Sequence, residues 1–139
     1  MAYFNEARVR YTPREPAAQT LVRDSIRRYP RLAGLKIVMS TGTPPAPRIV
    51  ASKVEAEMGQ PADQASREVL QTGKIYFGKE HGVAHVTMPL RDRNGETIAA
   101  VKVSLDSFPG QTEQNAIVRA QPIVKEIQMR VQSSVDLIE

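Results

Sequence analysis

The stretch Thr72–Leu105, TGKIYFGKEHGVAHVTMPLRDRNGETIAAVKVSL, decides the fold because it contains three β-type runs joined by short turns. Its last two runs, Val83–Leu90 and Glu96–Leu105, flank the dipeptide Asn94-Gly95. That dipeptide readily takes the two positive φ values of a type I′ hairpin turn. The stretch therefore predicts three consecutive antiparallel strands, with a defined register between the last two.

Counting outward from Asn94-Gly95 gives the hairpin two different faces, because successive side chains alternate across a strand. Apolar pairs share one face: Leu90 with Ala99, Met88 with Val101, and Val86 with Val103. Polar pairs share the other: Thr87 with Lys102, and His85 with Ser104. The polar face is either open to water, as in many one-sided antiparallel sheets, or the lining of a binding pocket.

Helices and two further strands are predicted on either side of this stretch. They are a helix over Pro16–Tyr29, strands at Leu35–Met39 and Arg48–Ser52, a helix over Ala62–Gln71 that ends at Gly73, and a long helix that begins after Thr112 and runs past Val135. Pro122 lies inside the last helix and predicts a kink or break near Gln121. The order suits one antiparallel five-stranded sheet in which the last strand lies in the middle, between the first and the fourth.

Composition excludes several chemistries. The 139 residues include no cysteine, which removes disulfides and thiolate chemistry, and the low aromatic content (5%) gives no evident platform for stacking nucleic-acid bases. No apolar run reaches the roughly 20 residues that span a bilayer, and the start lacks the apolar core of a signal peptide. We expect a chain that is soluble as given, either cytoplasmic or an extracytoplasmic domain without its leader.

The net charge of +4 lies in residues 1–31, which carry seven arginines against three acids. Arg23, Arg27 and Arg31 follow one side of the first predicted helix. Such a basic face either contacts phosphates or anionic lipids, or is simply solvated. Because no nucleic-acid-reading motif accompanies the arginines, we expect a solvated face and no nucleic-acid partner.

Two segments resemble the PAS-like sensor family known as Cache or PDC domains: Ile49–Phe77 (IVASKVEAEMGQPADQASREVLQTGKIYF) and Val86–Val103 (VTMPLRDRNGETIAAVKV). Their order of "G-x-P-A-D", helix, "T-G-K", strand and "P-L-x-D-x-x-G-x-x-I" is similar to that family's pattern. The resemblance implies an α+β, PAS-like fold, with the N-terminal and C-terminal helices packed on one face of the sheet. It also implies a small molecule bound between the sheet and the connecting segment, and terminal helices that relay a signal or form a dimer.

We expect a single domain over residues 1–139. Within it, residues 1–31 form a basic helical segment, residues 35–105 hold the sheet with its connecting helix, and residues 111–139 form the C-terminal helix.

The candidate ligand-binding residues come from the polar face of the sheet. If the last strand is central, Lys102 is at least partly buried, and a buried ammonium group needs a partner. No acid lies beside Lys102 in the expected register, so a carboxylate of a small anionic ligand could complete the site. The full candidate set is Lys102, Thr87, His85, Ser104, Lys36 and Tyr76.

Catalysis and metal binding find little support in the sequence. His81 and His85 lie four residues apart, which separates them by roughly 13 Å along a strand and too far for one zinc ion. No nucleophile with a base, paired carboxylates or phosphate loop is evident, and no cofactor is expected. We therefore predict a non-enzymatic sensory domain for a small organic anion such as a carboxylate, in a homodimer; the alternative is a homodimerisation or interaction module with a vestigial pocket.

Overall fold

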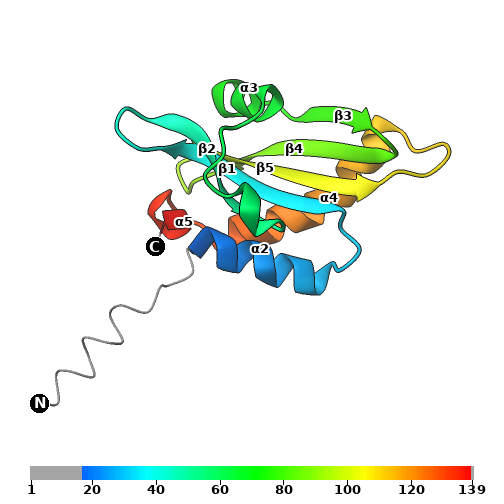
Figure 1. The fold of residues 1–139 in the computed structure, drawn as a ribbon, viewed down its shortest axis with the longest axis horizontal. Coiled ribbons are helices and arrows are strands. Elements are labelled where there is room, and N and C mark those ends of the chain that lie inside the picture. Colours follow the sequence, from blue (N-terminus) through cyan, green and yellow to red (C-terminus); the bar gives the residue numbers. More distant parts are fainter. Residues whose placement is uncertain (1–16, 139) are drawn as a thin grey trace, which may run out of the picture.

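A computed structural model of the chain describes residues 17–138, which fold into one five-stranded sheet with helices on both of its faces (Figure 1). The elements, in chain order, are α2 (Ala17–Arg28), β1 (Gly34–Thr41), β2 (Ala46–Ser52), the 3-10 turn η1 (Glu55–Glu57), α3 (Gln64–Thr72), β3 (Tyr76–Glu80), β4 (Val83–Arg91), β5 (Thr97–Asp106), α4 (Glu113–Met129) and α5 (Val135–Ile138). Residues 1–16 of the N-terminal basic segment expected over residues 1–31 lie outside the described residues, and α2 forms most of the rest.

The sheet is antiparallel throughout, and its strand order is β2-β1-β5-β4-β3. The last strand, β5, therefore lies in the centre and pairs with β1 and β4, as the sequence predicts. Strands that are buried on both sides read as nearly continuous apolar runs. β5 fits this description, since six of its ten residues are buried.

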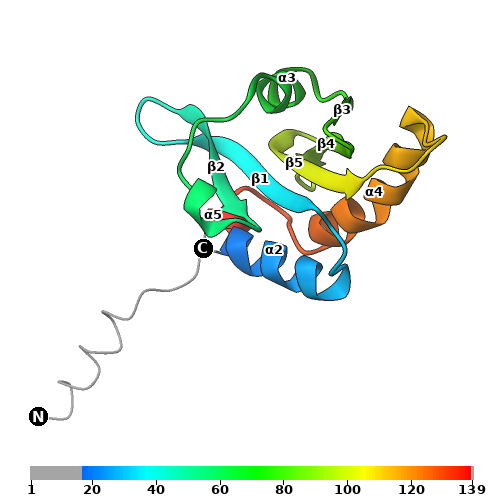
Figure 2. The ribbon, with the colours of Figure 1, turned by 45° about the vertical axis from the view of Figure 1, so that its right-hand side comes forward.

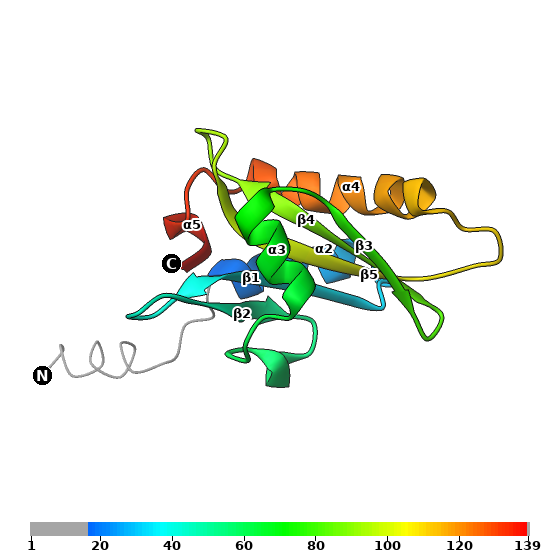
Figure 3. The ribbon, with the colours of Figure 1, turned by 90° about the horizontal axis from the view of Figure 1, so that it is seen from above.

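Helices α2 and α4 pack on one face of the sheet (Figure 2). The main core lies between these helices and the apolar side of the strands, and it includes Val101 and Val103 of β5, Val22 of α2 and Ile127 of α4. Helix α3 crosses β4 and β5 on the opposite face (Figure 3). A smaller apolar cluster, with Val38, Ala100 and Val69 among its members, lies under α3. The predicted α+β class, with both terminal helices on one face, is confirmed.

The register predicted between β4 and β5 is also confirmed. The observed partners are Leu90 with Ala99, Met88 with Val101, Thr87 with Lys102, Val86 with Val103, and His85 with Ser104. The side chains of Val86, Leu90, Val101 and Val103 belong to the main core. The even-numbered β5 residues face the other side, where α3 lies.

The turn between β4 and β5 differs from the predicted type I′ turn. The N–H of Gly95 donates to the carbonyl of Asp92 at 3.0 Å, and of the turn residues only Gly95 has a positive φ, of 83°. This is a type I turn followed by a bulge at glycine. A register shift at Leu90/Arg91 then restores the predicted pairing. Two consecutive positive φ values, as in a type I′ turn, occur instead at His81 (49°) and Gly82 (76°), between β3 and β4.

The C-terminal helix differs from its prediction in two ways. Helix α4 continues through Pro122, so of the predicted kink or break near Gln121 the break is wrong. Pro122 and Val118 are both exposed, which leaves the Val118 carbonyl near solvent where its lost helical hydrogen bond costs least. The helix ends instead at Met129, and the chain turns before α5, which brings Leu137 into the core.

Helix α3 ends before Gly73, as predicted, but it begins at Gln64, two residues after the predicted start at Ala62. Asp63 caps its N-terminus by accepting a hydrogen bond from the Ser66 N–H at 2.8 Å, and Gly73 ends it with φ of 71°. Strand β3 starts at Tyr76, within the stretch Thr72–Leu105 in which it was predicted. Among the helices between residues 17 and 138, none is long and apolar enough to cross a membrane.

Candidate functional site

The predicted site residues form two neighbouring rows across the polar face of the sheet. The first row crosses all five strands: Ser52, Lys36, Lys102, Thr87 and Tyr76. The second row contains Gly34, Ser104, His85 and Gly78. All six sequence-predicted residues therefore lie on one face, because period-two alternation and a central β5 bring them into register. Above this face lies the connecting segment, residues 53–75.

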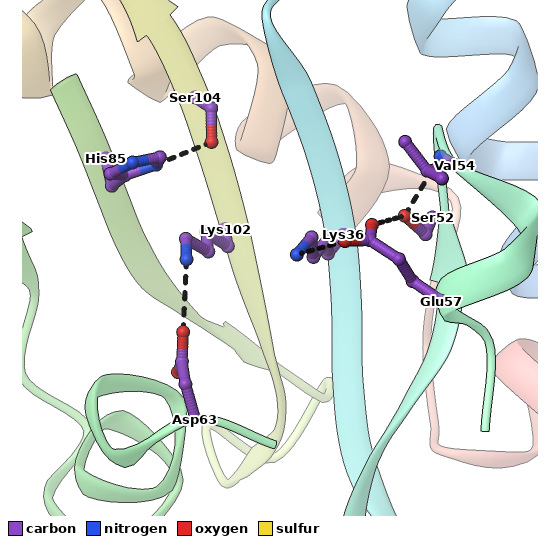
Figure 4. A network of polar contacts seen from close by, with 8 residues as sticks. All are labelled: Lys36, Ser52, Val54, Glu57, Asp63, His85, Lys102 and Ser104. Atoms are coloured by element: carbon purple, nitrogen blue, oxygen red, sulfur yellow. Dashed lines mark hydrogen bonds and ion pairs between the residues drawn. The ribbon is translucent and has the colours of Figure 1, made fainter. Parts of the chain in front are cut away.

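Lys102 is largely buried, and its partner is an acid of the connecting segment. Its side chain is 18% exposed, and its Nζ lies 3.1 Å from Oδ2 of Asp63, the capping residue of α3 (Figure 4). Burial of the Asp63 carboxyl group raises its pKa. Hydrogen bonds from Ser66 and from Lys102 lower that pKa by more than burial raises it. The net pKa of Asp63 therefore lies below its ordinary value. The neighbouring strands place no acid beside Lys102, as the register predicts, but the connecting segment supplies one that was not predicted.

Lys36 has an equivalent partner in the 3-10 turn η1. Its Nζ lies 3.1 Å from Oε2 of Glu57, while the Ser52 hydroxyl donates to Oε1 of Glu57 at 2.8 Å. Burial alone would raise the pKa of Glu57, but the hydrogen bonds from Ser52 and Lys36 outweigh it and hold that pKa below its usual range. Figure 4 shows both lysines reaching toward carboxylates of the connecting segment.

His85 and Ser104 form a separate contact further along the sheet. The Nδ1 atom of His85 lies 2.7 Å from Oγ of Ser104. Partial burial of the imidazole, followed by the nearby charge of Lys102, lowers the pKa of His85 below its ordinary value, which favours the neutral form of the ring. Ser104 is only 7% exposed, and among the described side chains no carboxylate bonds to the ring. The pair therefore lacks the oriented base of a catalytic serine site.

Thr87 and Tyr76 occupy the far end of the first row. Thr87 is fully buried, and its hydroxyl finds no hydrogen-bond partner among the described residues. The Tyr76 side chain remains 41% exposed, and its ring lies over Gly78, where an added Cβ would come within 3.1 Å of the ring. Gly78 thus leaves room for the aromatic ring on the polar face.

A cavity of about 200 Å³ lies between the sheet and the connecting segment. Its lining includes Lys36, Lys102 and Asp63, together with Ser66 and Gln60. Thr87, His85, Ser104 and Tyr76 share the face but do not line this cavity. Of the two acids paired with the lysines, Asp63 lines the cavity and Glu57 lies outside its lining. Each lysine has one acidic partner, so the fixed charges of these two pairs nearly cancel.

Asp63 and Glu57 were not among the residues predicted from the sequence. Asp63 is the second residue of the helix predicted over Ala62–Gln71, and an aspartate near a helix start is a capping signal, so its place as the cap of α3 could have been found. Its approach to β5 depends on the path of the connecting segment, which no periodicity fixes. Within residues 17–138, no cluster of three His, Cys, Asp or Glu side chains is arranged to hold a metal ion.

No protein-family model matches this sequence, and no curated protein matches it significantly. Solved structures do match its fold. The GAF domain of nlh2 from A. aeolicus, in an inactive state, is 11% identical with a TM-score of 0.57, covering 80% of this chain and 77% of that one. The GAF domain of a two-component sensor histidine kinase from Bacillus halodurans is 6% identical with a TM-score of 0.54, covering 85% and 91%.

A third similar structure is an enzyme, the type II free methionine-R-sulfoxide reductase from Thermoplasma acidophilum. It is 12% identical with a TM-score of 0.51, covering 79% of this chain and 93% of that one. At such identities the likeness defines the fold alone. The fold is that of GAF domains, which is a PAS-like fold.

The resemblance to Cache or PDC domains is therefore wrong at the level of the family, although the PAS-like sheet is right. Its motifs are local turn and capping chemistry. The aspartate of "G-x-P-A-D" is the α3 cap Asp63, the glycine of "T-G-K" is the left-handed Gly73, and Asp92 and Gly95 of "D-x-x-G" build a hairpin turn. A helix start, a helix end and a hairpin turn favour these residue types in any fold.

Proposed function

We propose that this chain is a non-enzymatic sensory domain that binds a small molecule between the polar face of the sheet and the connecting segment. One observation carries the proposal: two partly buried lysines on the sheet each hold a carboxylate of the connecting segment, around a cavity of about 200 Å³. The GAF-type fold supports it, since one protein of this fold is a sensor histidine kinase.

The ligand class that we propose is a small organic anion, such as a carboxylate, which takes the place of Asp63 at Lys102. Asp63 is 47% exposed while Lys102 is 18% exposed, so the acid is the partner that can leave for solvent. A cavity of this size is below the roughly 300–1,000 Å³ of sites for drug-sized ligands, which favours a ligand of few atoms. Replacement of Asp63 by the ligand at Lys102 would free the residue that caps α3 and so change the conformation of the connecting segment. That conformational change would be the signal.

The first experiment is a thermal-shift screen against small carboxylates, amino acids and sugars. A ligand at a hundred times its dissociation constant stabilises the folded state by about 2.7 kcal/mol, which raises Tm by several degrees. We expect a carboxylate to give this shift. In the Lys102→Met variant the shift is lost, whereas in Lys125→Met, which removes an exposed lysine of α4, it is retained. Equal shifts in the parent and in Lys102→Met would contradict the proposed contact.

The alternative function is a homodimerisation or interaction module whose pocket is vestigial. Two observations favour it: the ion pairs of the chain already satisfy both lysines, and Met129 and Ile138, near the end of α4 and in α5, are 76% and 61% exposed. No thermal shift with any compound class, together with a dimer by sedimentation equilibrium, would support this alternative over the sensor.

A further inference from the structure

A second groove lies on the helical side of the molecule, at the C-terminal end of α2. Figure 2 shows α2 and α4 together on this side of the sheet. It has a volume of about 390 Å³ and is lined by Leu32, Leu105, Ile123, Arg28, Arg31 and Arg119 among others. We call it the arginine groove. Leu105 is an odd-numbered residue of β5 and belongs to the main core, so the groove is on the opposite face of the sheet from Lys102.

The floor of the arginine groove is apolar. Leu32 and Leu105 are each 5% exposed, and Ile123 is 2% exposed. These side chains come from the turn after α2, the end of β5 and the middle of α4, so three core-forming elements hold the floor in place. An apolar ligand body placed on this floor would contact packed side chains. Removal of its apolar surface from water would stabilise the complex.

The rim of the groove carries more positive charge than the described acids neutralise. Arg28 is paired with Glu126 at 2.9 Å, and the same Glu126 oxygen accepts from Tyr29. Arg119 instead donates to the main-chain carbonyl of Asp106 at 3.4 Å, and its guanidinium lies 5.5 Å from the centre of the Phe108 ring. Neither contact removes its charge.

Arg31 is exposed and forms no ion pair within residues 17–138. Two guanidinium groups without a carboxylate therefore flank an apolar floor. Guanidinium groups bind carboxylates through charge-assisted, often bidentate hydrogen bonds. The groove volume lies within the range of small-molecule sites.

We propose that the arginine groove binds an amphipathic monocarboxylate, whose apolar body rests on Leu105 and Ile123 and whose carboxylate lies between Arg31 and Arg119. The charge complementarity selects an acid over a neutral molecule, and the floor selects an apolar body over a simple inorganic anion. This site is separate from the cavity at Lys102 and does not depend on the function proposed there.

Decanoate is a suitable probe, with decanol as its uncharged counterpart. Titration of the isotope-labelled protein, below the concentration at which decanoate forms micelles, reports binding through the methyl resonances of Leu105 and Ile123. We expect decanoate to shift both resonances saturably and decanol to bind at least about fivefold more weakly, because it lacks the charged head group.

Substitutions at the rim test the placement of the carboxylate. Arg31→Gln and Arg119→Gln should each weaken decanoate binding by at least about fivefold, whereas Arg31→Lys, which keeps the charge, should weaken it less. Arg67→Gln, an exposed arginine on α3 across the sheet, should leave it unchanged. These arginines are exposed, so we expect the variants to fold like the parent. The methyl spectra of the variants verify this.

Two results would overturn the proposal. Binding of decanol as tight as that of decanoate would remove the role of the arginines, and unchanged decanoate affinity in both glutamine variants would place the carboxylate elsewhere. The test is independent of the sensor function, since Lys102→Met is expected to bind decanoate like the parent.

Discussion

At the scale of a single residue, Asp63 links helix α3 to the central strand β5 through its two carboxylate oxygens. One carboxylate oxygen caps the helix by accepting from Ser66, and the other contacts Lys102. Because Asp63 has both roles, a group that binds to Lys102 in its place would also affect the start of α3.

Substitutions of Asp63 separate the two roles. Asp63→Ala removes the cap and the ion pair, and it should lower the free energy of unfolding by more than the ~1 kcal/mol typical of a lost cap. Asp63→Asn keeps a capping oxygen and should cost less. Thr112→Ala, which removes the cap of α4 without breaking an ion pair, is the matched control. Urea unfolding measures all three; an Asp63→Ala cost no larger than that of Thr112→Ala would mean that the Lys102 contact adds no stability.

His85 should make stability depend on pH. Because burial and Lys102 lower its pKa in the folded state, the unfolded chain binds the proton more readily. The stabilising contribution is therefore complete above the unfolded pKa of about 6.5 and is lost as pH falls through the folded value. We expect the free energy of unfolding to fall more between about pH 7.5 and about pH 5 in the parent than in His85→Gln. Identical pH profiles would contradict this sign.

The site residues on the strands were predictable, whereas their partners were not. Lys36, Thr87 and Lys102 follow from alternation and register, two local rules that the sequence displays directly. The acids Asp63 and Glu57 reach the lysines through an irregular segment whose path is set by tertiary packing. For that reason the sequence suggests an unpaired Lys102, and the structure places a carboxylate 3.1 Å from it.

At the scale of the elements, the hairpin between β4 and β5 tolerates a different turn without losing its register. The bulge at Gly95 shifts the pairing by one residue, and the irregularity at Leu90/Arg91 shifts it back. Burial of one face favours this compensation, because a one-residue slip would move Val86, Val101 and Val103 out of the core.

Gly95 should tolerate asparagine better than alanine. Its φ is 83° and an added Cβ would meet nothing within 4 Å, so the penalty is conformational and not steric crowding. Gly95→Ala should lower the free energy of unfolding by about 1 kcal/mol, and Gly95→Asn by less, since asparagine adopts the left-handed region more readily. Urea unfolding of both variants checks this. Equal stability of Gly95→Ala and the parent would mean that the turn changes type.

The boundaries of helix α4 differ from those that local sequence preferences predict. Pro122 predicts an interruption, yet the helix continues because the proline lies on its exposed side, while Ala120 and Ile123 pack in the core. The actual end, at Met129, is fixed by the turn that brings Leu137 into the core. Tertiary packing overrides the local preference in both places.

At the scale of the whole molecule, strand order and layer arrangement were predictable from the sequence of elements. Two strands, a helical segment and three further strands leave few antiparallel arrangements, and the central position of β5 follows. The family within the PAS-like folds was not predictable, because the residues that resembled Cache domains serve turns and caps. The similarity to GAF domains lies in the three-dimensional path of the chain and not in its residues.

The central position of β5 also has a consequence for synthesis. When β1 and β2 emerge from the ribosome, β1 has one open edge, and its second partner is about 65 residues further along the chain. At roughly 5–20 residues per second, that edge stays unpaired for about 3–13 seconds. We therefore expect the nascent chain to depend on chaperones most strongly in this interval, before β5 closes the middle of the sheet.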